Sequence, residues 1–207
     1  MTTQGEMHTL CVPDEAAWRD WLIVHGDTSD GVWLVLAKKG TELPTSLSYQ
    51  LALEEALCSG WIDGQRRSYD DTTFLQRFTP RRARSIWSQR NVNLIAELRH
   101  SGRLRAGGER EVARAQADGR WDRAYAGPAQ AVAPDGLRAA LARHPRAEAA
   151  FAALSSTARY SALHPILTAA RPETQERRIA ALIARLDVPD TDSGPVHTTG
   201  READATG

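Results

Sequence analysis

Lysine, cysteine and long apolar runs are scarce in this chain of 207 residues. The two cysteines, Cys11 and Cys58, lack metal-ligand spacing and are too few for a disulfide framework, which fits a reducing compartment. No run of eighteen apolar residues occurs, so we expect no membrane span. The first ten residues lack the basic start and apolar stretch of a secretory signal. These absences together predict a cytoplasmic protein.

Motifs for common cofactors and metals are also missing. The six histidines form no HxH or HxxxH pair, and the chain contains no HExxH, no P-loop, no GxSxG and no GxGxxG after a strand. We therefore expect neither a metal nor a cofactor.

Charge of one sign is absent overall but not locally. Lys and Arg number 26, of which two are lysine, and Asp and Glu also number 26. Residues 1–60 carry three basic and nine acidic residues, whereas residues 66–105 carry ten arginines and three acidic residues. A segment with this excess of arginine builds a local positive field even in a neutral protein.

The residue pattern predicts an α+β fold with a small, mainly antiparallel sheet and flanking helices in the N-terminal half. Short apolar runs indicate strands at 31–37, 61–65 and 74–78, the last two joined as a hairpin. Helical spacing follows, with a helix expected from Ser85 to His100 whose core positions are Ile86, Val92, Ile95 and Leu98. We expect an all-helical C-terminal half, in which one helix runs from Ser156 to Ala170 and is interrupted by Pro165. We place an α+β region at 12–126, a helical region at 134–186 and a disordered tail at 187–207, whose composition is rich in Asp, Thr, Gly and Pro.

A carboxylate stands on an otherwise apolar strand in the segment Trp61-Ile-Asp63. Burying an unpaired acid is costly, so Asp63 needs a partner. One interpretation makes Asp63 a general acid or base, or a group that orients a ligand. The other makes it half of a structural pair with an adjacent arginine.

In and after this strand, arginines alternate with the aromatic residues Trp61, Phe74, Phe78 and Trp87. Guanidinium groups suit carboxylate and phosphate ligands, and interleaved rings suit a flat anionic molecule or stacked bases. The candidate ligand-binding residues are Trp61, Arg77, Arg81, Trp87, Ser88 and Asn91. Ser88 and Asn91 lie near the start of the expected helix, where backbone amides favour anions. The alternatives are ordinary capping by Ser85 and a solvated arginine face neutralised by the acidic first sixty residues.

Several of these segments resemble a known family. They are Gly31-Val-Trp-Leu followed by Lys38-Lys39, Glu55-Ala-Leu-Cys-Ser-Gly-Trp-Ile-Asp-Gly64, Gln76-Arg-Phe-Thr-Pro-Arg81, Ser85-Ile-Trp-Ser88 and Gly119-Arg-Trp121. With the helix over 172–186, they resemble the YdeI/OmpD-associated family, often labelled bacteriocin-protection proteins. The resemblance covers roughly residues 12–186. It implies a bacterial protein linked to stress or bacteriocin tolerance, and it implies no established reaction or catalytic set.

Three functions remain open from the sequence. The first is binding of a small anionic molecule in a pocket of Arg, Trp and Asp. The second is an enzyme that acts on a small carboxylate- or phosphate-bearing substrate with Asp63 as acid or base. The third is weak nucleic-acid binding through residues 66–105, which the neutral charge and the lack of a known motif make the least favoured.

Overall fold

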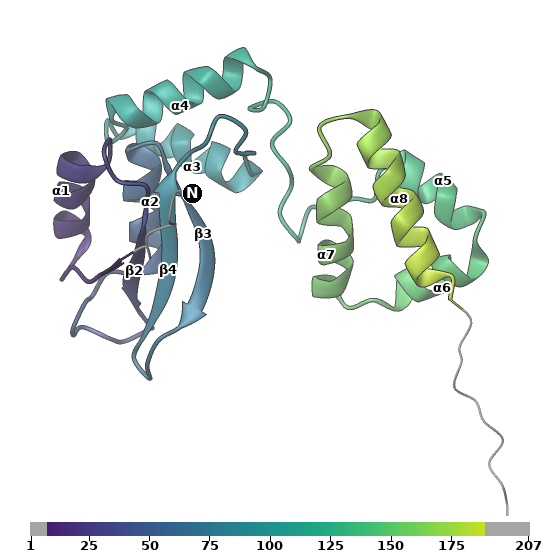
Figure 1. Cartoon of the computed structure of the whole chain (residues 1–207), viewed down its shortest axis with the longest axis horizontal. Coiled ribbons are helices and arrows are strands. Elements are labelled where there is room, and N and C mark those ends of the chain that lie inside the picture. The colour runs from purple at the N-terminus through teal and green to yellow at the C-terminus, as the bar shows by residue number, and fades with distance from the viewer. Residues whose placement is uncertain (1–7, 189–207) are drawn as a thin grey trace, which may run out of the picture. The chain divides into compact units, whose positions relative to one another are not determined.

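The computed structural model describes residues 8–188, and the chain divides into two compact units. The N-terminal unit extends to Ala131 and the C-terminal unit begins at Val132. Each unit has its own set of helices, and the sheet belongs to the first (Figure 1). The α+β class is therefore confirmed. From residue 189 on, the predicted tail lies outside the described residues.

The described elements follow one another in a simple order. The N-terminal unit contains β1 (Thr9–Leu10), α1 (Glu15–His25), β2 (Val32–Ala37), α2 (Tyr49–Cys58), β3 (Trp61–Ser68), β4 (Thr73–Pro80), α3 (Gln89–His100) and α4 (Ala106–Ala117). The C-terminal unit contains α5 (Asp135–Ala142), α6 (Pro145–Ala153), α7 (Ser156–Leu167) and α8 (Pro172–Leu186). Among the described residues no helix has the length and apolar character needed to cross a membrane.

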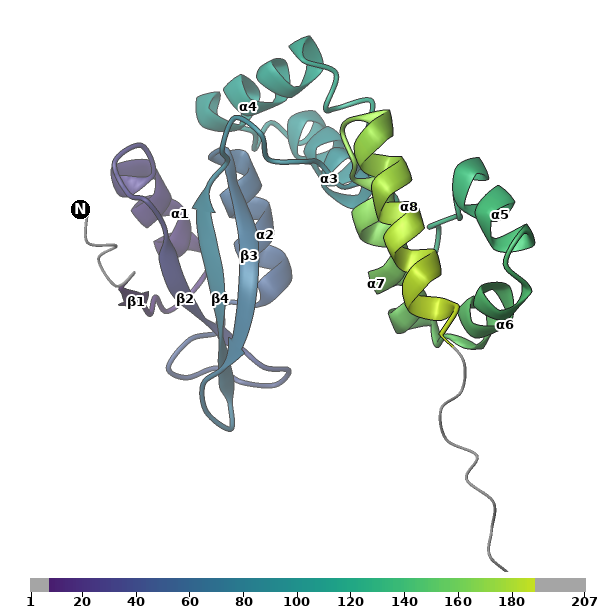
Figure 2. The same ribbon diagram turned by 45° about the vertical axis from the view of Figure 1, so that its right-hand side comes forward.

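The sheet is mixed and has the order β1-β2-β4-β3 (Figure 2). The β2–β4 and β3–β4 pairs are antiparallel, as predicted, and β3 and β4 form the expected hairpin. The short edge strand β1 pairs in parallel with β2. The sequence did not predict this strand, because its two residues are too few to show the alternation of apolar and polar residues that indicates a strand. A register shift in β3 lies between Asp63 and Arg66. There the buried Gln76 side chain donates hydrogen bonds to the carbonyls of Gly64 and Gln65, which satisfies backbone groups near the irregularity.

The aromatic core of the N-terminal unit joins α1 to the sheet. Trp18 is fully buried and its ring meets those of Trp61 and Phe78, at centroid distances of 6.2 and 5.7 Å. The Trp18 indole donates to the carbonyl of Ala52 in α2, and the Trp61 indole donates to the carbonyl of Gly26 just after α1. Each large ring thus packs on apolar neighbours while its one donor is satisfied.

A buried carboxylate joins α2 to the segment between α3 and α4. Glu55 is 1% exposed, and its two oxygens accept hydrogen bonds from Arg103 at 2.8 Å and Arg105 at 2.7 Å. Arg103 also binds Glu54 and Glu15. Acidic residues among residues 1–60 therefore neutralise two arginines of the arginine-rich segment 66–105. Within the described part of the chain, they do not pair with the arginines of that segment that precede α3.

The start of α3 differs from the sequence prediction. The helix begins at Gln89 rather than Ser85, and its N-cap is Ser88, whose hydroxyl accepts from the Asn91 amide. Backbone hydrogen bonds to Tyr125 hold the preceding residues extended, because Trp87 accepts from the Tyr125 amide and Gln89 donates to its carbonyl. Ile86, expected in the core, is 45% exposed for this reason. A contact made by a distant segment decided this boundary.

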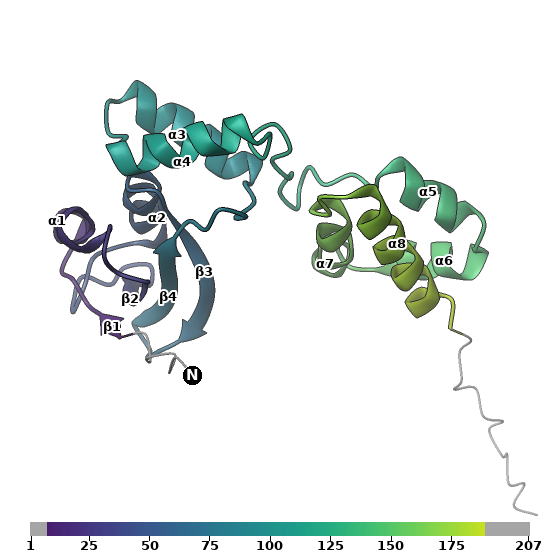
Figure 3. The same ribbon diagram turned by 45° about the horizontal axis from the view of Figure 1, so that its top comes forward.

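The C-terminal unit is built around α8, which packs against α5, α6 and α7 (Figure 3). Its apolar stripe of Ile179, Leu182 and Ile183 is buried, as the helical spacing predicts, and its bounds match the predicted 172–186 helix. The helix α7 ends at Leu167, before the expected Ala170. Pro165, which has no amide hydrogen, lies in its last turn.

We expect Trp61→Ala to destabilise the N-terminal unit by about 3–5 kcal/mol, because it removes a buried ring and a tertiary hydrogen bond. All six tryptophans lie in this unit, so urea unfolding followed by tryptophan emission reports on it alone. Trp61→Phe keeps an apolar ring and should cost clearly less. A loss below about 1 kcal/mol for the alanine variant would contradict the core role.

We expect Glu55→Gln to destabilise the same unit by about 3–5 kcal/mol, because Arg103 and Arg105 lose the carboxylate that they share. Glu54→Gln is the matched control. Glu54 also pairs with Arg103, but its side chain is 18% exposed and a smaller loss is expected. Equal losses in the two variants would contradict the special role of the buried acid.

The same network predicts a pH dependence. Burial raises the pKa of Glu55, but the hydrogen bonds of Arg103 and Arg105 and the charges of Arg105 and Arg19 outweigh burial and hold the pKa below its usual range. A lowered folded-state pKa means that this stabilisation is complete above about pH 5 and is lost as pH falls through the folded-state pKa. Urea unfolding of the wild type and of Glu55→Gln across this range should show the difference between them shrinking toward low pH.

Candidate functional site

Arg81 is the most buried arginine of the predicted site, at 5% exposure. It follows β4 directly, where its amide donates to the carbonyl of Gly60 at 3.0 Å. Its guanidinium lies 3.5 Å from the ring centroid of Trp87, and one nitrogen donates to the carbonyl of Ile86. The segment between β4 and α3 thus folds back so that its first residue stacks on a residue near its end.

A second segment, after α4, supports this arrangement. The Trp121 ring contacts the Trp87 ring edge-on at a centroid distance of 4.9 Å. Arg120 binds Asp118 through Nε and donates from Nη1 to the carbonyl of Ser85 at 2.7 Å. Together with the backbone pairing at Tyr125, these contacts hold residues 85–89 in place through residues that come after α4 in the sequence.

Several donors in this region have no acceptor. In the described part of the chain, the buried side-chain polar atoms without a hydrogen-bond partner are all N–H donors: Nε of Arg77, Nε and Nη2 of Arg81, Nε1 of Trp87 and Nη2 of Arg120. Four of the five belong to Arg81, Trp87 and Arg120, which we call the Arg81 cluster. Buried donors in folded proteins are nearly always paired, so the cluster calls for an acceptor.

The cluster is also positively charged. Burial lowers the pKa of Arg81 to about 10, while the charges of Glu111 and Asp63 act to raise it, so the guanidinium remains protonated at neutral pH. Neither carboxylate supplies a hydrogen bond to the free Arg81 donors. Glu111 instead pairs with Arg114. A buried cation with unused donors favours a negatively charged acceptor.

Asp63 has a different partner from the one expected. Its Oδ2 accepts a hydrogen bond from the Tyr49 hydroxyl of α2 at 2.8 Å, and within residues 8–188 no ion pair links it to an arginine. Burial and the Asp63 charge raise the pKa of Tyr49 to about 12. Tyr49 therefore stays protonated and keeps donating to Asp63, which is an alternative to the expected Asp–Arg pair.

The structure brings together only some of the predicted site residues. Arg81 and Trp87 are in contact, and Asp63 lies close enough for its charge to act on Arg81. Ser88 caps α3, and the buried Asn91 donates its backbone amide to that cap. Trp61 belongs to the aromatic core.

Arg77 does not join the Arg81 cluster. It precedes Phe78 in β4, and consecutive strand residues point to opposite faces. Since Phe78 contacts Trp18 in the core, Arg77 lies on the other face of the sheet. The residues that sequence reasoning missed are Tyr49, Glu111 and Arg120. Arg120 stood in the Gly119-Arg-Trp121 motif, but nothing in the sequence connects it with Ser85, thirty-five positions earlier.

The aromatic rings of the arginine-rich segment are not free for base stacking. Trp61, Phe78 and Trp87 are at most 2% exposed. Phe74 is 6% exposed, and the guanidinium of Arg66 covers its ring at 3.8 Å. These four rings were the ones that interleaved with arginine in the sequence, and none of them offers an open face.

The described residues favour neither a metal site nor a reactive thiol. No group of three or more His, Cys, Asp or Glu side chains within it is placed to hold a metal ion. Burial, followed by the charge of Glu55, raises the pKa of Cys58 to about 11, so its thiol stays protonated at neutral pH. A protonated buried thiol is a poor nucleophile.

Comparison with known proteins assigns different parts of the chain to two family models. Residues 10–111 match a domain of unknown function (DUF8412), and residues 130–187 match the family described as bacteriocin-protection, YdeI or OmpD-associated. Neither the curated proteins nor the solved structures include a significant match. The motifs between residues 31 and 91, on which the resemblance also rested, lie in the part matched by the first model. The predicted resemblance is therefore confirmed over the C-terminal helical region, where residues 130–187 are similar to the bacteriocin-protection, YdeI or OmpD-associated family.

Proposed function

We propose that the N-terminal unit binds a small oxyanion, such as a carboxylate or phosphate group, at the Arg81 cluster. The observation that carries this proposal is the set of four buried donors on Arg81, Trp87 and Arg120 that have no acceptor. Leaving a buried donor unpaired costs about 1–3 kcal/mol, and more for a charged group. One oxyanion has enough lone pairs to accept from several of these donors at once.

In this proposal an anion reaches the cluster past the segment between β4 and α3. Arg82, Ala83 and Arg84 of this segment are exposed, whereas Arg81 and Trp87 are buried. The exposed arginines add positive charge around the entrance and attract anions toward it. The buried pair then supplies directional hydrogen bonds. The flat ring of Trp87 is already covered by Arg81 and Trp121, so the ligand meets the ring edge rather than its face.

No observation of similar weight supports the enzyme hypothesis or the nucleic-acid hypothesis. Asp63 is engaged by Tyr49, and the rings that would stack on bases are buried. The family match supports a coarser proposal alongside anion binding, namely a role in bacteriocin protection. A cytoplasmic location is part of the same proposal, and the free cysteines Cys11 and Cys58 are consistent with it.

The proposal predicts that oxyanions stabilise the N-terminal unit. Thermal unfolding followed by tryptophan emission should shift upward in phosphate, sulfate or acetate relative to chloride at the same ionic strength. At a hundred times the Kd, the expected gain is about 2.7 kcal/mol. If no oxyanion shifts the transition more than chloride does, the donors are satisfied by water and the proposal is wrong.

Variants assign the effect to the cluster. Arg81→Lys keeps the charge but loses the fork of donors, and we expect affinity to fall about ten- to a hundred-fold. Trp87→Phe keeps the ring and removes only Nε1, so it should weaken binding less while preserving the fold. Arg82→Lys, at an exposed position beside Arg81, is the matched control and should bind as the wild type does. A loss in Arg82→Lys equal to that in Arg81→Lys would indicate binding to the surface field alone.

A further inference from the structure

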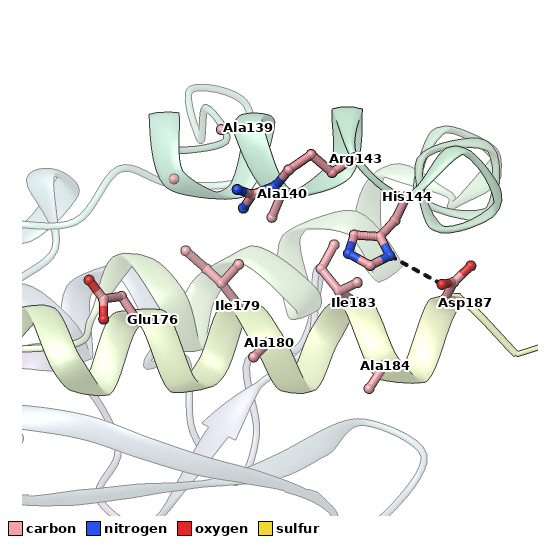
Figure 4. Close-up of a pocket in the computed structure, with 11 residues that line it drawn as sticks. Ala139, Ala140, Arg143, His144, Glu176, Ile179, Ala180, Ile183, Ala184 and Asp187 are labelled. Atoms are coloured by element: carbon pink, nitrogen blue, oxygen red, sulfur yellow. Dashed lines mark hydrogen bonds and ion pairs between the residues drawn. The ribbon is translucent and has the colours of Figure 1, made fainter.

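The C-terminal unit contains a pocket of about 640 Å³ between α5 and α8. Its apolar lining comes from Ala139 and Ala140 of α5 and from Ile179, Ala180, Ile183 and Ala184 of α8 (Figure 4). This volume falls within the range of small-molecule sites, about 300–1,000 Å³. The pocket is separate from the Arg81 cluster, which belongs to the N-terminal unit.

The pocket exists because small residues face each other along two helices. A Cβ added to Gly136, near the start of α5, would lie 3.3 Å from the Cδ1 atom of Ile179. At the other end, His144, just after α5, contacts Asp187, just after α8, at 3.2 Å. The two helices therefore run in the same direction along the pocket. Alanine at the positions between these contacts leaves space that a larger side chain would fill.

The charges around this pocket are unevenly paired. Asp187 contacts His144 at 3.2 Å and pairs with Arg146 at 3.5 Å, so the arginine opposes its charge. Arg143 is exposed, and its side chain has no hydrogen bond or ion pair among the described residues. Figure 4 shows its guanidinium beside Ala140, over the apolar lining, between Glu176 at one end of the pocket and Asp187 at the other.

We propose that this pocket binds a small apolar anion, an aromatic or short aliphatic carboxylate or sulfonate. Arg143 binds the anionic group, and the isoleucine and alanine side chains contact the apolar body. The carboxylates Glu176 and Asp187, at the two ends of the pocket, repel an anionic group and so favour its position at Arg143 between them. A docked helix fits less well, because the Arg143 side chain lies in the groove beside Ala140 where such a helix would run.

The test uses the full chain and the fluorescent probe 8-anilinonaphthalene-1-sulfonate, an aromatic sulfonate. We expect saturable binding of one probe per chain, displaced by 1-naphthoate and octanoate. Arg143→Gln should weaken probe binding about ten- to a hundred-fold, since it removes a charge-assisted contact. Arg185→Gln, which changes an exposed arginine of α8 outside the pocket lining, is the matched control and should bind the probe normally.

Two further measurements separate the anionic group from the apolar body. The uncharged analogue N-phenyl-1-naphthylamine should bind wild type and Arg143→Gln equally, because it has no group for the arginine. Ala180→Phe, at an exposed position on the pocket lining, should abolish binding of both probes while far-UV circular dichroism stays unchanged. Unchanged probe affinity in Arg143→Gln, or in Ala180→Phe, would overturn the proposal.

Phosphate competition and the Arg81→Lys variant distinguish probe binding in the α5–α8 pocket from anion binding at the Arg81 cluster. Phosphate alone should not displace the probe, and Arg81→Lys should leave probe binding intact, because the two sites lie in different units. Displacement of the probe by phosphate, together with its loss in Arg81→Lys, would place the probe at the Arg81 cluster and overturn the assignment to the α5–α8 pocket. A stabilising effect of phosphate with no probe binding would support the first proposal and reject the second.

Discussion

The N-terminal unit depends on the neutralisation of one buried carboxylate. Glu55 lies in the middle of the α2 core face, where an isolated charge would be prohibitively costly. Arg103 and Arg105 come from about fifty residues later in the chain and bind both of its oxygens. The connection between α3 and α4 must therefore lie against α2 for the charge to be satisfied. Once it does, α4 is held close to the end of α2, where Gly107 and Gly60 allow the two backbones to approach.

The Arg81 cluster stands out against this background. The same unit shows how its fold satisfies charged groups, with direct bonds at the buried Glu55 and with a tyrosine hydroxyl at the partly buried Asp63. Arg81 is as deeply buried, yet two of its nitrogens have no acceptor and the nearest influential carboxylates act on it without a hydrogen bond. A charge that the fold buries but does not pair is a feature of sites that receive a charged ligand. This contrast within one unit is the physical basis for proposing an anion there.

The two units use their charged residues in different ways. In the N-terminal unit, arginines are drawn into the interior or stacked on rings, as Arg66 is on Phe74 and Arg81 on Trp87. In the C-terminal unit, the four helices pack through Leu, Ile and Ala, and charges remain at the surface around the α5–α8 pocket. The first arrangement suits a compact, hydrogen-bonding anion, and the second suits an apolar molecule that carries a single charge. The family match falls on the second unit and the uncharacterised domain on the first.

Local chemistry in the sequence determined the element types, the α3 core positions Ile95 and Leu98, and the bounds of α8, because spacing and capping act over a few residues. The sequence also identified Arg81 and Trp87 as candidates, because guanidinium and indole groups that lie close together in the sequence suit a flat anionic ligand. Tertiary contacts decided the rest. Tyr125 pairs with residues 87 and 89 and moves the start of α3 to Gln89, and the alternation of β4 separates Arg77 from Arg81. Arg120 reaches Ser85 only in the folded chain, because no local pattern records which segments, dozens of residues apart, will exclude water from the same place.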